Sequence, residues 1–262
     1  MRIGIIGATG WLGSALGGRL LSLGIVTPDR LVVANRSGAR SDYHGHAVTW
    51  ARDAVELAAL SDIVVVSVRP QDWPALGLGA EGKLVLSFMA GVGSDRLRDC
   101  GGRIVRAMPN AAADIGRSWT PWWADQGVTD ADRQAVTTIL SAIGTSDEIA
   151  RESQIDLMTA LPGSGAAYPA LMAVAMARFM TDNGLPPDIA WRAADAAVCG
   201  GAAMLAGRIA DAPALLAAYR DYRGTTAAGI DAAEAAGFSA AIRAALDAAA
   251  RKARAMAGDA PA

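Results

Sequence analysis

The chain has 262 residues, of which 52% are hydrophobic and 19% charged, so it can bury the core of one large domain or of two smaller ones. The formal net charge of −2 gives no reason to expect nucleic-acid binding. The two cysteines are far apart and form no C-x-x-C motif, so neither a disulfide framework nor a zinc site is predicted. No uncharged apolar run reaches membrane-spanning length, and the chain opens on a strand pattern rather than a signal peptide, so we expect a cytoplasmic protein without a membrane or nucleic-acid partner.

The first thirteen residues predict a strand, a glycine turn and a helix. Residues 2–6 are mostly apolar, a G-x-x-G-x-x-G sequence follows, and leucines then recur at helical spacing. Backbone N–H groups at the start of such a helix can face a pyrophosphate, and glycine lets the phosphate approach closely. We therefore expect a dinucleotide-binding turn, with an ordinary strand-to-helix turn as the alternative. The candidate cofactor-binding residues here are Gly7, Thr9, Gly10, Trp11 and Leu12.

The end of the second predicted strand, residues 30–34, indicates which dinucleotide is bound. An NAD-selective site usually places an acidic residue here to accept from the ribose 2′-hydroxyl, whereas this strand is followed by Asn35, Arg36 and Ser37. These side chains can donate to a 2′-phosphate, and arginine can do so with two parallel hydrogen bonds. We therefore predict NADP(H) rather than NAD(H), with Arg40 as a second candidate; Arg36 as a solvated loop charge is the alternative.

The next strands end in loops that carry glycine, proline and polar side chains. Strands are predicted over residues 47–50, 62–68, 83–89 and 103–108, with a helix over 53–60 that Asp53 caps. Loops at the carboxyl ends of parallel strands bind ligands in α/β sheets, so we expect a crevice here, with ordinary turn chemistry as the alternative. A tryptophan cluster at positions 119, 122 and 123 is interpreted as packing on an edge strand, followed by a helix over 129–143 and a last strand over 144–149.

From about residue 153 the pattern is helical. Helices are expected over residues 154–161, 166–183, 187–207, 213–221, 225–236 and 238–256. The stretches 166–180 and 190–205 are apolar on most sides, and a helix of that kind should be buried. We infer a helical half that packs against a second copy of itself; a self-sufficient helical domain is the alternative. The predicted fold is α/β, with a Rossmann-type doubly wound sheet over residues 1–152 and an all-helical dimerisation and substrate domain over 153–262.

Motifs along nearly the whole chain resemble those of the pyrroline-5-carboxylate reductase family. Besides the glycine turn, the matching stretches are Val68-Arg69-Pro70-Gln71, Ala90-Gly91-Val92, Arg106-Ala107-Met108-Pro109-Asn110, the segment from Thr159 to Tyr168, Asn183-Gly184-Leu185-Pro186 and the segment from Gly224 to Gly229. The resemblance implies an NAD(P)H-dependent enzyme with a Rossmann half and a helical dimerisation half. It also implies reduction of the cyclic imine 1-pyrroline-5-carboxylate to L-proline, in a homodimer or a larger homo-oligomer.

The resemblance assigns roles to individual positions. It implies that Thr226 contacts the imine nitrogen and that the turn at Gly224 and Thr225 holds the substrate carboxylate through backbone N–H groups. It places Val68, Arg69, Pro70, Ala90 and Asn110 against the cofactor, and Ser164 at the hinge into the helical half.

The chain departs from the family pattern in three places. Its glycine turn is one residue longer than the usual G-x-G-x-x-G, and Pro162-Gly163-Ser164-Gly165-Ala166 stands where members commonly have Ser-Gly-Ser-Gly-Pro. Asp221-Tyr222-Arg223-Gly224 replaces the family's Ser-Pro-Gly-Gly before the two threonines. Asp221 would repel a carboxylate and Arg223 could offset that, so a different cyclic imine is an alternative substrate, and a non-catalytic NADP-binding module is the alternative function.

Independent of the resemblance, the residues fit imine reduction better than ketone reduction. A ketone needs a group to move the oxygen's proton, but the helical half has no histidine, its one lysine is near the chain end, and no Tyr-x-x-x-Lys is present. An imine can enter already protonated, so positioning and a hydrogen bond to nitrogen suffice, and Thr226 could supply that bond. Tyr168 is a possible proton donor, with a helix-packing aromatic as the alternative.

Overall fold

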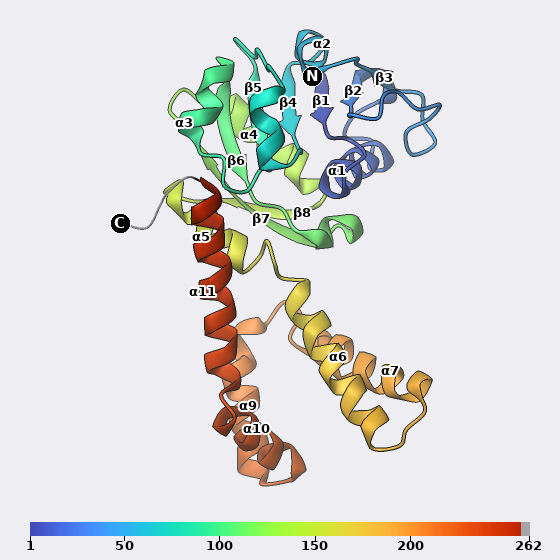
Figure 1. Cartoon of the computed structure of the whole chain (residues 1–262), viewed down its shortest axis with the longest axis vertical. Coiled ribbons are helices and arrows are strands. Elements are labelled where there is room, and N and C mark those ends of the chain that lie inside the picture. Colours follow the sequence, from blue (N-terminus) through green and yellow to red (C-terminus); the bar gives the residue numbers. More distant parts are fainter. Residues whose placement is uncertain (258–262) are drawn as a thin grey trace. The chain divides into compact units, whose positions relative to one another are not determined.

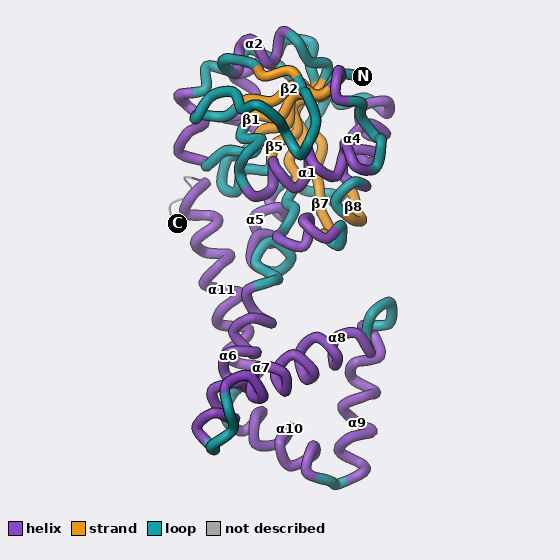
Figure 2. Tube along the Cα trace, turned by 90° about the vertical axis from the view of Figure 1, so that its right-hand side faces the viewer, coloured by secondary structure: helices purple, strands orange, loops and turns teal. Residues whose placement is uncertain are grey.

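The computed structural model describes residues 1–257 and divides into two compact units. The first unit contains Met1–Gly165 together with residues 248–257, and the second contains Ala166–Asp247. Among the described residues, every strand belongs to the first unit and the second consists of helices and loops (Figure 2).

The first unit is built on one eight-stranded sheet with the order β3-β2-β1-β4-β5-β6-β7-β8 (Figure 1). Its strands are β1 (Ile3–Ile6), β2 (Leu31–Ala34), β3 (Thr49–Trp50), β4 (Ile63–Val66), β5 (Leu84–Ser87), β6 (Arg103–Ala107), β7 (Ser118–Ala124) and β8 (Gly144–Glu148). Its helices are α1 (Trp11–Ser22), α2 (Ala54–Ala59), α3 (Ser94–Leu97), α4 (Asp130–Ser141) and α5 (Ser153–Ala160), with 3₁₀ segments η1 (Pro28–Arg30), η2 (Pro70–Ala75), η3 (Arg98–Cys100) and η4 (Ala111–Ile115).

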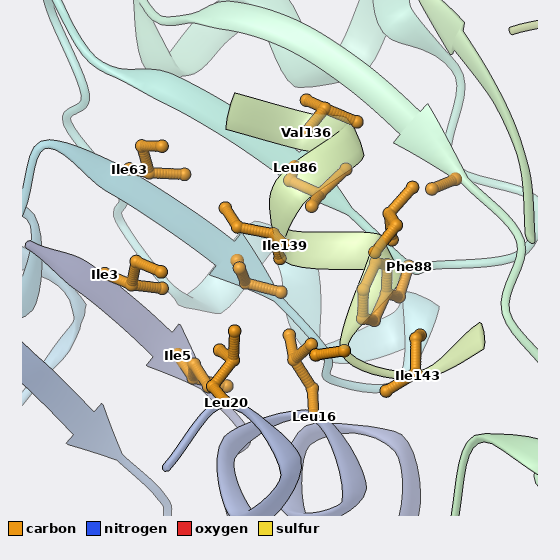
Figure 3. Close-up of a cluster of buried hydrophobic side chains, with 14 of the residues drawn as sticks. Ile3, Ile5, Leu16, Leu20, Ile63, Leu86, Phe88, Val136, Ile139 and Ile143 are labelled. Carbon is orange, nitrogen blue, oxygen red and sulfur yellow. The ribbon is translucent and has the colours of Figure 1, made fainter. Parts of the chain in front are cut away.

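Helices bury both faces of this sheet, as the continuous apolar runs of its central strands predict. On one face, Ile3 and Ile5 pack with Leu16 of α1 and with Val136 and Ile139 of α4 (Figure 3). The alternate strand residues point to the other face, where a second cluster includes residues of α2, η2 and α3. The predicted Rossmann-type doubly wound architecture is confirmed.

The tryptophan-rich strand β7 is not an edge strand, contrary to expectation. It pairs antiparallel with β6 and parallel with β8, which is the edge strand. The residues of β8 are polar and mostly exposed, as is typical of an edge strand. Trp122 of β7 is only 4% exposed.

The second unit is helical, with one interruption that the sequence pattern does not predict. Its elements are α6 (Ala167–Asp182), α7 (Pro187–Asp195), the π-helical segment η5 (Ala196–Gly200), α8 (Gly201–Met204), η6 (Ile209–Asp211), α9 (Ala212–Tyr222), α10 (Thr225–Ala235) and α11 (Phe238–Ala257), the last of which runs into the first unit. The π segment lies inside the helix expected over 187–207 and ends at Gly200, the first residue of the Gly200-Gly201 pair.

Within the described residues, no single helix combines the length and the apolar composition that crossing a membrane requires. The segments Pro187–Met204 and Ile209–Tyr222 meet the length and composition criteria only as a pair that is bent by 106°.

An ion pair connects α4 to the start of β6. Arg103 donates from Nε and Nη2 to the two carboxylate oxygens of Asp132 at 2.7 and 2.8 Å, and Thr129 completes a capping box with the same carboxylate. The hydrogen bonds from Arg103, with further bonds from Thr129, lower the pKa of Asp132 from 3.8 to about 2. A carboxyl whose pKa is lower in the folded state stabilises the fold above the unfolded pKa and ceases to do so as the pH falls through the folded value.

We expect Asp132→Asn to lower the free energy of unfolding at pH 7 by about 2 kcal/mol, from the pKa shift and with some screening of the pair by solvent. The difference from the unmodified protein should shrink as the pH falls from about 4 towards 2. Chemical denaturation at several pH values measures it. Asp130→Asn is the matched control, because the Asp130 carboxylate lies on the same helix and is 100% exposed; equal losses in the two variants would contradict the expectation.

Candidate functional site

The glycine turn after β1 packs tightly against the ends of β2 and β4. The N–H groups of Gly7 and Ala8 both donate to the carbonyl of Ala34, at 2.9 and 3.2 Å. Gly7 has a φ of +81°, and a Cβ there would lie 2.8 Å from the carbonyl carbon of Ser67, so this position needs glycine. The turn therefore sits where β2 and β4 flank β1, which is the place at which a doubly wound sheet binds ligands.

The start of α1 offers unpaired backbone donors. Gly10 is the N-cap, and its own N–H donates to the carbonyl of Gly7 at 2.9 Å. Within residues 1–257, the N–H groups of Thr9, Trp11 and Leu12 have no acceptor in the protein. Such donors at the N-terminus of a twelve-residue helix attract an anion, which fits the pyrophosphate that the sequence predicts.

The residues predicted to bind the cofactor after β4, β5 and β6 follow the same edge of the sheet. These strands are parallel to β1 and consecutive in the sheet, so the segments that begin at Val68, Ala90 and Pro109 emerge side by side. Arg69 is exposed and precedes Pro70, the first residue of η2. Asn110 caps η4, because its Oδ1 accepts from the N–H of Ala112 at 2.9 Å.

The structure gives Asn35, at the end of β2, a role beside the turn. Its Nδ2 donates to the Oγ1 of Thr9 at 3.2 Å, which joins two predicted cofactor residues. Its Oδ1 is buried and has no hydrogen-bond partner in the described part of the chain. Arg36 and Ser37 are exposed next to it, free to meet a ligand from solvent.

Trp11 lies at the first position of α1 and is 67% exposed. Its indole Nε1 donates to Oδ2 of Asp114 in η4 at 2.6 Å. This bond joins the glycine turn to the 3₁₀ segment that Asn110 caps, so these two parts of the predicted cofactor set are connected.

Two buried groups beside this set could not be identified from the sequence. Arg106 is 2% exposed and donates to Glu152 at 2.8 Å and to Asp156 at 3.2 Å, and Glu152 also accepts from the backbone N–H and the hydroxyl of Ser94 at 2.6 Å each. Through Ser94, Glu152 and Asp156, this network holds the start of α3 and the start of α5 against Arg106 of β6.

The second buried group is Tyr43, in a segment that the sequence presents as a surface loop. The only sequence signal for it is the Gly17-Gly18 pair inside α1, which leaves room for a ring.

The residues predicted to bind substrate lie mainly in the second unit. Gly224 is the N-cap of α10, and it has no side chain that could accept from the first N–H groups of the helix. Thr225 and Thr226 occupy the first turn of α10, and their side chains are exposed. An N-terminus of this kind can receive a carboxylate, as the resemblance implies. Tyr168 is partly buried in α6, and Ser164, at the end of the first unit, donates to the carbonyl of Thr159 at 2.9 Å.

The substituted loop before these threonines has an unusual backbone. Arg223 ends α9 with a φ of +56°, a left-handed conformation that side chains with a Cβ adopt at a cost of about 1 kcal/mol. Asp221 and Tyr222 are exposed, Tyr222 at 86%. The loop therefore presents charge and an aromatic ring at the position where the family pattern has small residues.

Comparison with known proteins matches both parts of the chain. The family described as "Pyrroline-5-carboxylate reductase dimerisation" matches residues 152–256, and the family described as "NADP oxidoreductase coenzyme F420-dependent" matches residues 2–91. The pyrroline-5-carboxylate reductase of Synechocystis sp. is 33% identical over 213 residues, which cover 78% of this chain and 79% of that protein.

Solved structures are similar over nearly the whole chain. A pyrroline-5-carboxylate reductase from Coxiella burnetii is 27% identical with a TM-score of 0.85, covering 97% of this chain and 98% of that one. A Plasmodium falciparum pyrroline carboxylate reductase with NADP bound shares the fold at 24% identity, with a TM-score of 0.85 and 98% of each chain covered. The motifs, the fold and these similarities agree: the chain belongs to the pyrroline-5-carboxylate reductase family.

Proposed function

We propose that this protein is an NADPH-dependent oxidoreductase that reduces a cyclic imine, 1-pyrroline-5-carboxylate, to L-proline. The observation that carries the proposal is that one chain holds a glycine-turn nucleotide site in its first unit and the family's two threonines at a helix N-terminus in its second. Pyrroline-5-carboxylate reductases are among the relatives that match both halves.

The first unit fits a dinucleotide phosphate. The unpaired donors of Thr9, Trp11 and Leu12 lie at the start of α1, and a Cβ at Gly7 or Gly13 would fill the space beside the turn. When NADPH is bound there, it supplies the hydride. Val68, Arg69, Pro70, Ala90 and Asn110 then border it along the carboxyl edge of the sheet.

The end of β2 fits an adenosine ribose that carries a 2′-phosphate. The unpaired Oδ1 of Asn35 can accept from a ribose hydroxyl, while its Nδ2 is already bonded to Thr9. This leaves Arg36 and Ser37 as the phosphate donors, with Arg40 further along the same segment. With no carboxylate at residues 35–41, the segment favours NADP(H) over NAD(H).

The second unit supplies positioning rather than a strong acid. The N–H groups at the start of α10 hold the substrate carboxylate, and the Thr226 hydroxyl forms a hydrogen bond with the imine nitrogen. A protonated imine is already electrophilic, so these contacts satisfy the reaction without a lysine or histidine. Ser164 is a further contributor that the family pattern suggests, and Tyr168 is a candidate proton donor with a helix-packing aromatic as the alternative. The exposed Asp221 and Arg223 favour a second candidate, a family member that acts on a different cyclic imine.

We expect the protein to oxidise NADPH with 1-pyrroline-5-carboxylate, and Thr226→Ala to lower kcat/KM about tenfold or more, as the loss of a hydrogen bond to a charged group predicts. NADPH affinity should change less than twofold in that variant. A spectrophotometric assay over several cyclic imines measures both quantities. Thr138→Ala is the control, because its hydroxyl donates within α4 to the carbonyl of Gln134.

The same assay separates the alternatives. Much faster turnover of another cyclic imine would favour the second candidate. NADPH binding without turnover of any imine would leave only a nucleotide-binding module and contradict the proposal. Full activity of Thr226→Ala would remove this residue from the site.

We expect Arg36→Asp to reverse cofactor preference, raising the KM for NADPH about ten- to a hundredfold, because a charge-assisted bond to phosphate is lost and a repulsive charge is introduced. The KM for NADH should change little. Arg30→Asp is a matched control at the opposite end of β2, where Arg30 is also exposed. An unchanged NADPH to NADH preference in Arg36→Asp would contradict the role of Arg36.

We also propose that the protein is a homodimer or a larger homo-oligomer. The single chain leaves large apolar side chains of the second unit exposed, among them Leu171, Phe179, Ile189, Trp191, Ile209 and Leu216. The family that matches this part is described by its dimerisation. Light scattering after gel filtration should give a mass of at least twice the 26.8 kDa of one chain, and a monomer mass would contradict this proposal.

A further inference from the structure

Tyr43 is a buried residue in an otherwise exposed loop, and its hydroxyl reaches the glycine turn. Its exposure is 4%, while Asp42, His44 and Gly45 beside it are exposed. The hydroxyl lies 2.9 Å from the carbonyl oxygen of Ala8 and 3.2 Å from that of Gly13, so it donates into the turn. Burial raises the pKa of Tyr43, which keeps the hydroxyl protonated as the donor.

The ring of Tyr43 is seated in a position shaped for it. A Cβ at Gly17 would lie 2.7 and 2.8 Å from Cε1 and Cζ of the ring. The Tyr43 ring therefore occupies the space that a side chain at position 17 of α1 would fill. Trp50 packs edge-on at a centroid distance of 6.0 Å. The backbone of Tyr43 also exchanges two hydrogen bonds with His46, at 3.0 and 3.1 Å. These contacts fix the side chain and the end of its loop.

The bond to Ala8 orients the turn. The peptide between Ala8 and Thr9 is trans, so its carbonyl and its N–H point in opposite directions. A carbonyl that is held on Tyr43 therefore directs the Thr9 N–H away from Tyr43. That N–H is one of the unpaired donors assigned to the pyrophosphate, so the hydroxyl of Tyr43 sets the orientation of a cofactor-binding group that it does not itself touch.

The same side chain fixes the segment that carries the 2′-phosphate donors. Residues 36–42 are exposed, and they include Arg36, Ser37 and Arg40. One end of this segment is held by the β2 ladder at Ala34, and the other end is held at Tyr43. The hydroxyl thus sets how far the predicted 2′-phosphate donors lie from the predicted pyrophosphate donors.

We propose that Tyr43 is a positioning residue for NADPH selectivity, which joins the pyrophosphate turn to the 2′-phosphate segment through its hydrogen bonds to Ala8 and Gly13. The proposal rests on the proposed function, because it takes NADPH as the cofactor. NADH uses the turn and Asn35 beside it, whereas NADPH uses these together with the segment 36–42. Loss of the hydroxyl therefore weakens NADPH binding more than NADH binding.

The test is Tyr43→Phe in the full-length protein, with NADPH and NADH dissociation constants measured by fluorescence titration. The phenyl ring keeps the packing on Gly17, so only the two hydroxyl contacts are lost. We expect the NADPH dissociation constant to rise about fivefold or more, the scale of a lost hydrogen bond. The ratio of the NADH to the NADPH constant should fall about threefold, with kcat at saturating NADPH within twofold of the unmodified protein.

A matched pair on α1 tests the same point without altering Tyr43. Gly17→Ala places a methyl group against the Tyr43 ring and hydroxyl, and it should lower the selectivity ratio as Tyr43→Phe does. Gly18→Ala adds the same methyl one residue later, where its nearest contacts are the exposed His44 imidazole at 2.9–3.1 Å. That imidazole lies edge-on to the Tyr43 ring at a centroid distance of 4.6 Å but can turn into solvent, so Gly18→Ala should lower the ratio much less than Gly17→Ala does. Both substitutions remove one glycine from the same helix, so the gain in helix propensity is common to them.

The outcomes separate this proposal from the proposed function. Unmodified protein that fails to bind NADPH would contradict the proposed function. Normal binding by the unmodified protein, with an unchanged selectivity ratio in Tyr43→Phe and Gly17→Ala, would overturn only the role of Tyr43. An equal loss of affinity for both cofactors would also overturn it, because it would show a general structural role.

Discussion

The close approach of the glycine turn to the end of β4 is the contact on which the candidate cofactor face depends. The Gly7 backbone lies against the Ser67 carbonyl in a conformation that only glycine adopts readily, and Gly13 brings the first turn of α1 equally close to Gly7. Any side chain at these positions would separate β1 from its neighbours at the edge where they meet the ligand. The donors of α1, the polar end of β2 and the loop after β4 can then act on one molecule.

The two units have different chemical tasks, and the composition of each reflects its task. The first needs anion donors and rigid backbone, and it obtains them from a helix N-terminus, glycines and the buried hydrogen bonds of Tyr43 and Arg106. The second needs little acid–base strength if the substrate is an imine, because a protonated C=N group already attracts hydride. A helical unit without histidine, with two threonines at the start of α10, is sufficient for that requirement.

Much of this arrangement follows from local sequence, and the part that does not depends on contacts between distant segments. The glycine turn, the buried central strands and the Asp53 cap have short-range patterns, and the structure confirms them. The interior place of β7 is set by which strand pairs with β6, and no feature of its own sequence reveals that pairing. The sequence around Tyr43 likewise predicts an exposed loop residue. Its burial depends on a distant segment, α1, where Gly17 leaves space for the ring.

The loop before α10 shows how a family member can keep the reaction type while the groups around its substrate change. The family pattern has glycine where Arg223 adopts a left-handed backbone, so this chain accepts a conformational cost of about 1 kcal/mol that glycine would avoid. Strain of this kind persists only where surrounding structure or function maintains it. Here the strained residue carries a positive charge two positions after Asp221 and one before the α10 N-cap. Under the proposed function, that charge would partly offset the repulsion which Asp221 introduces towards a carboxylate, so the start of α10 would still suit an anion while the groups around it have changed.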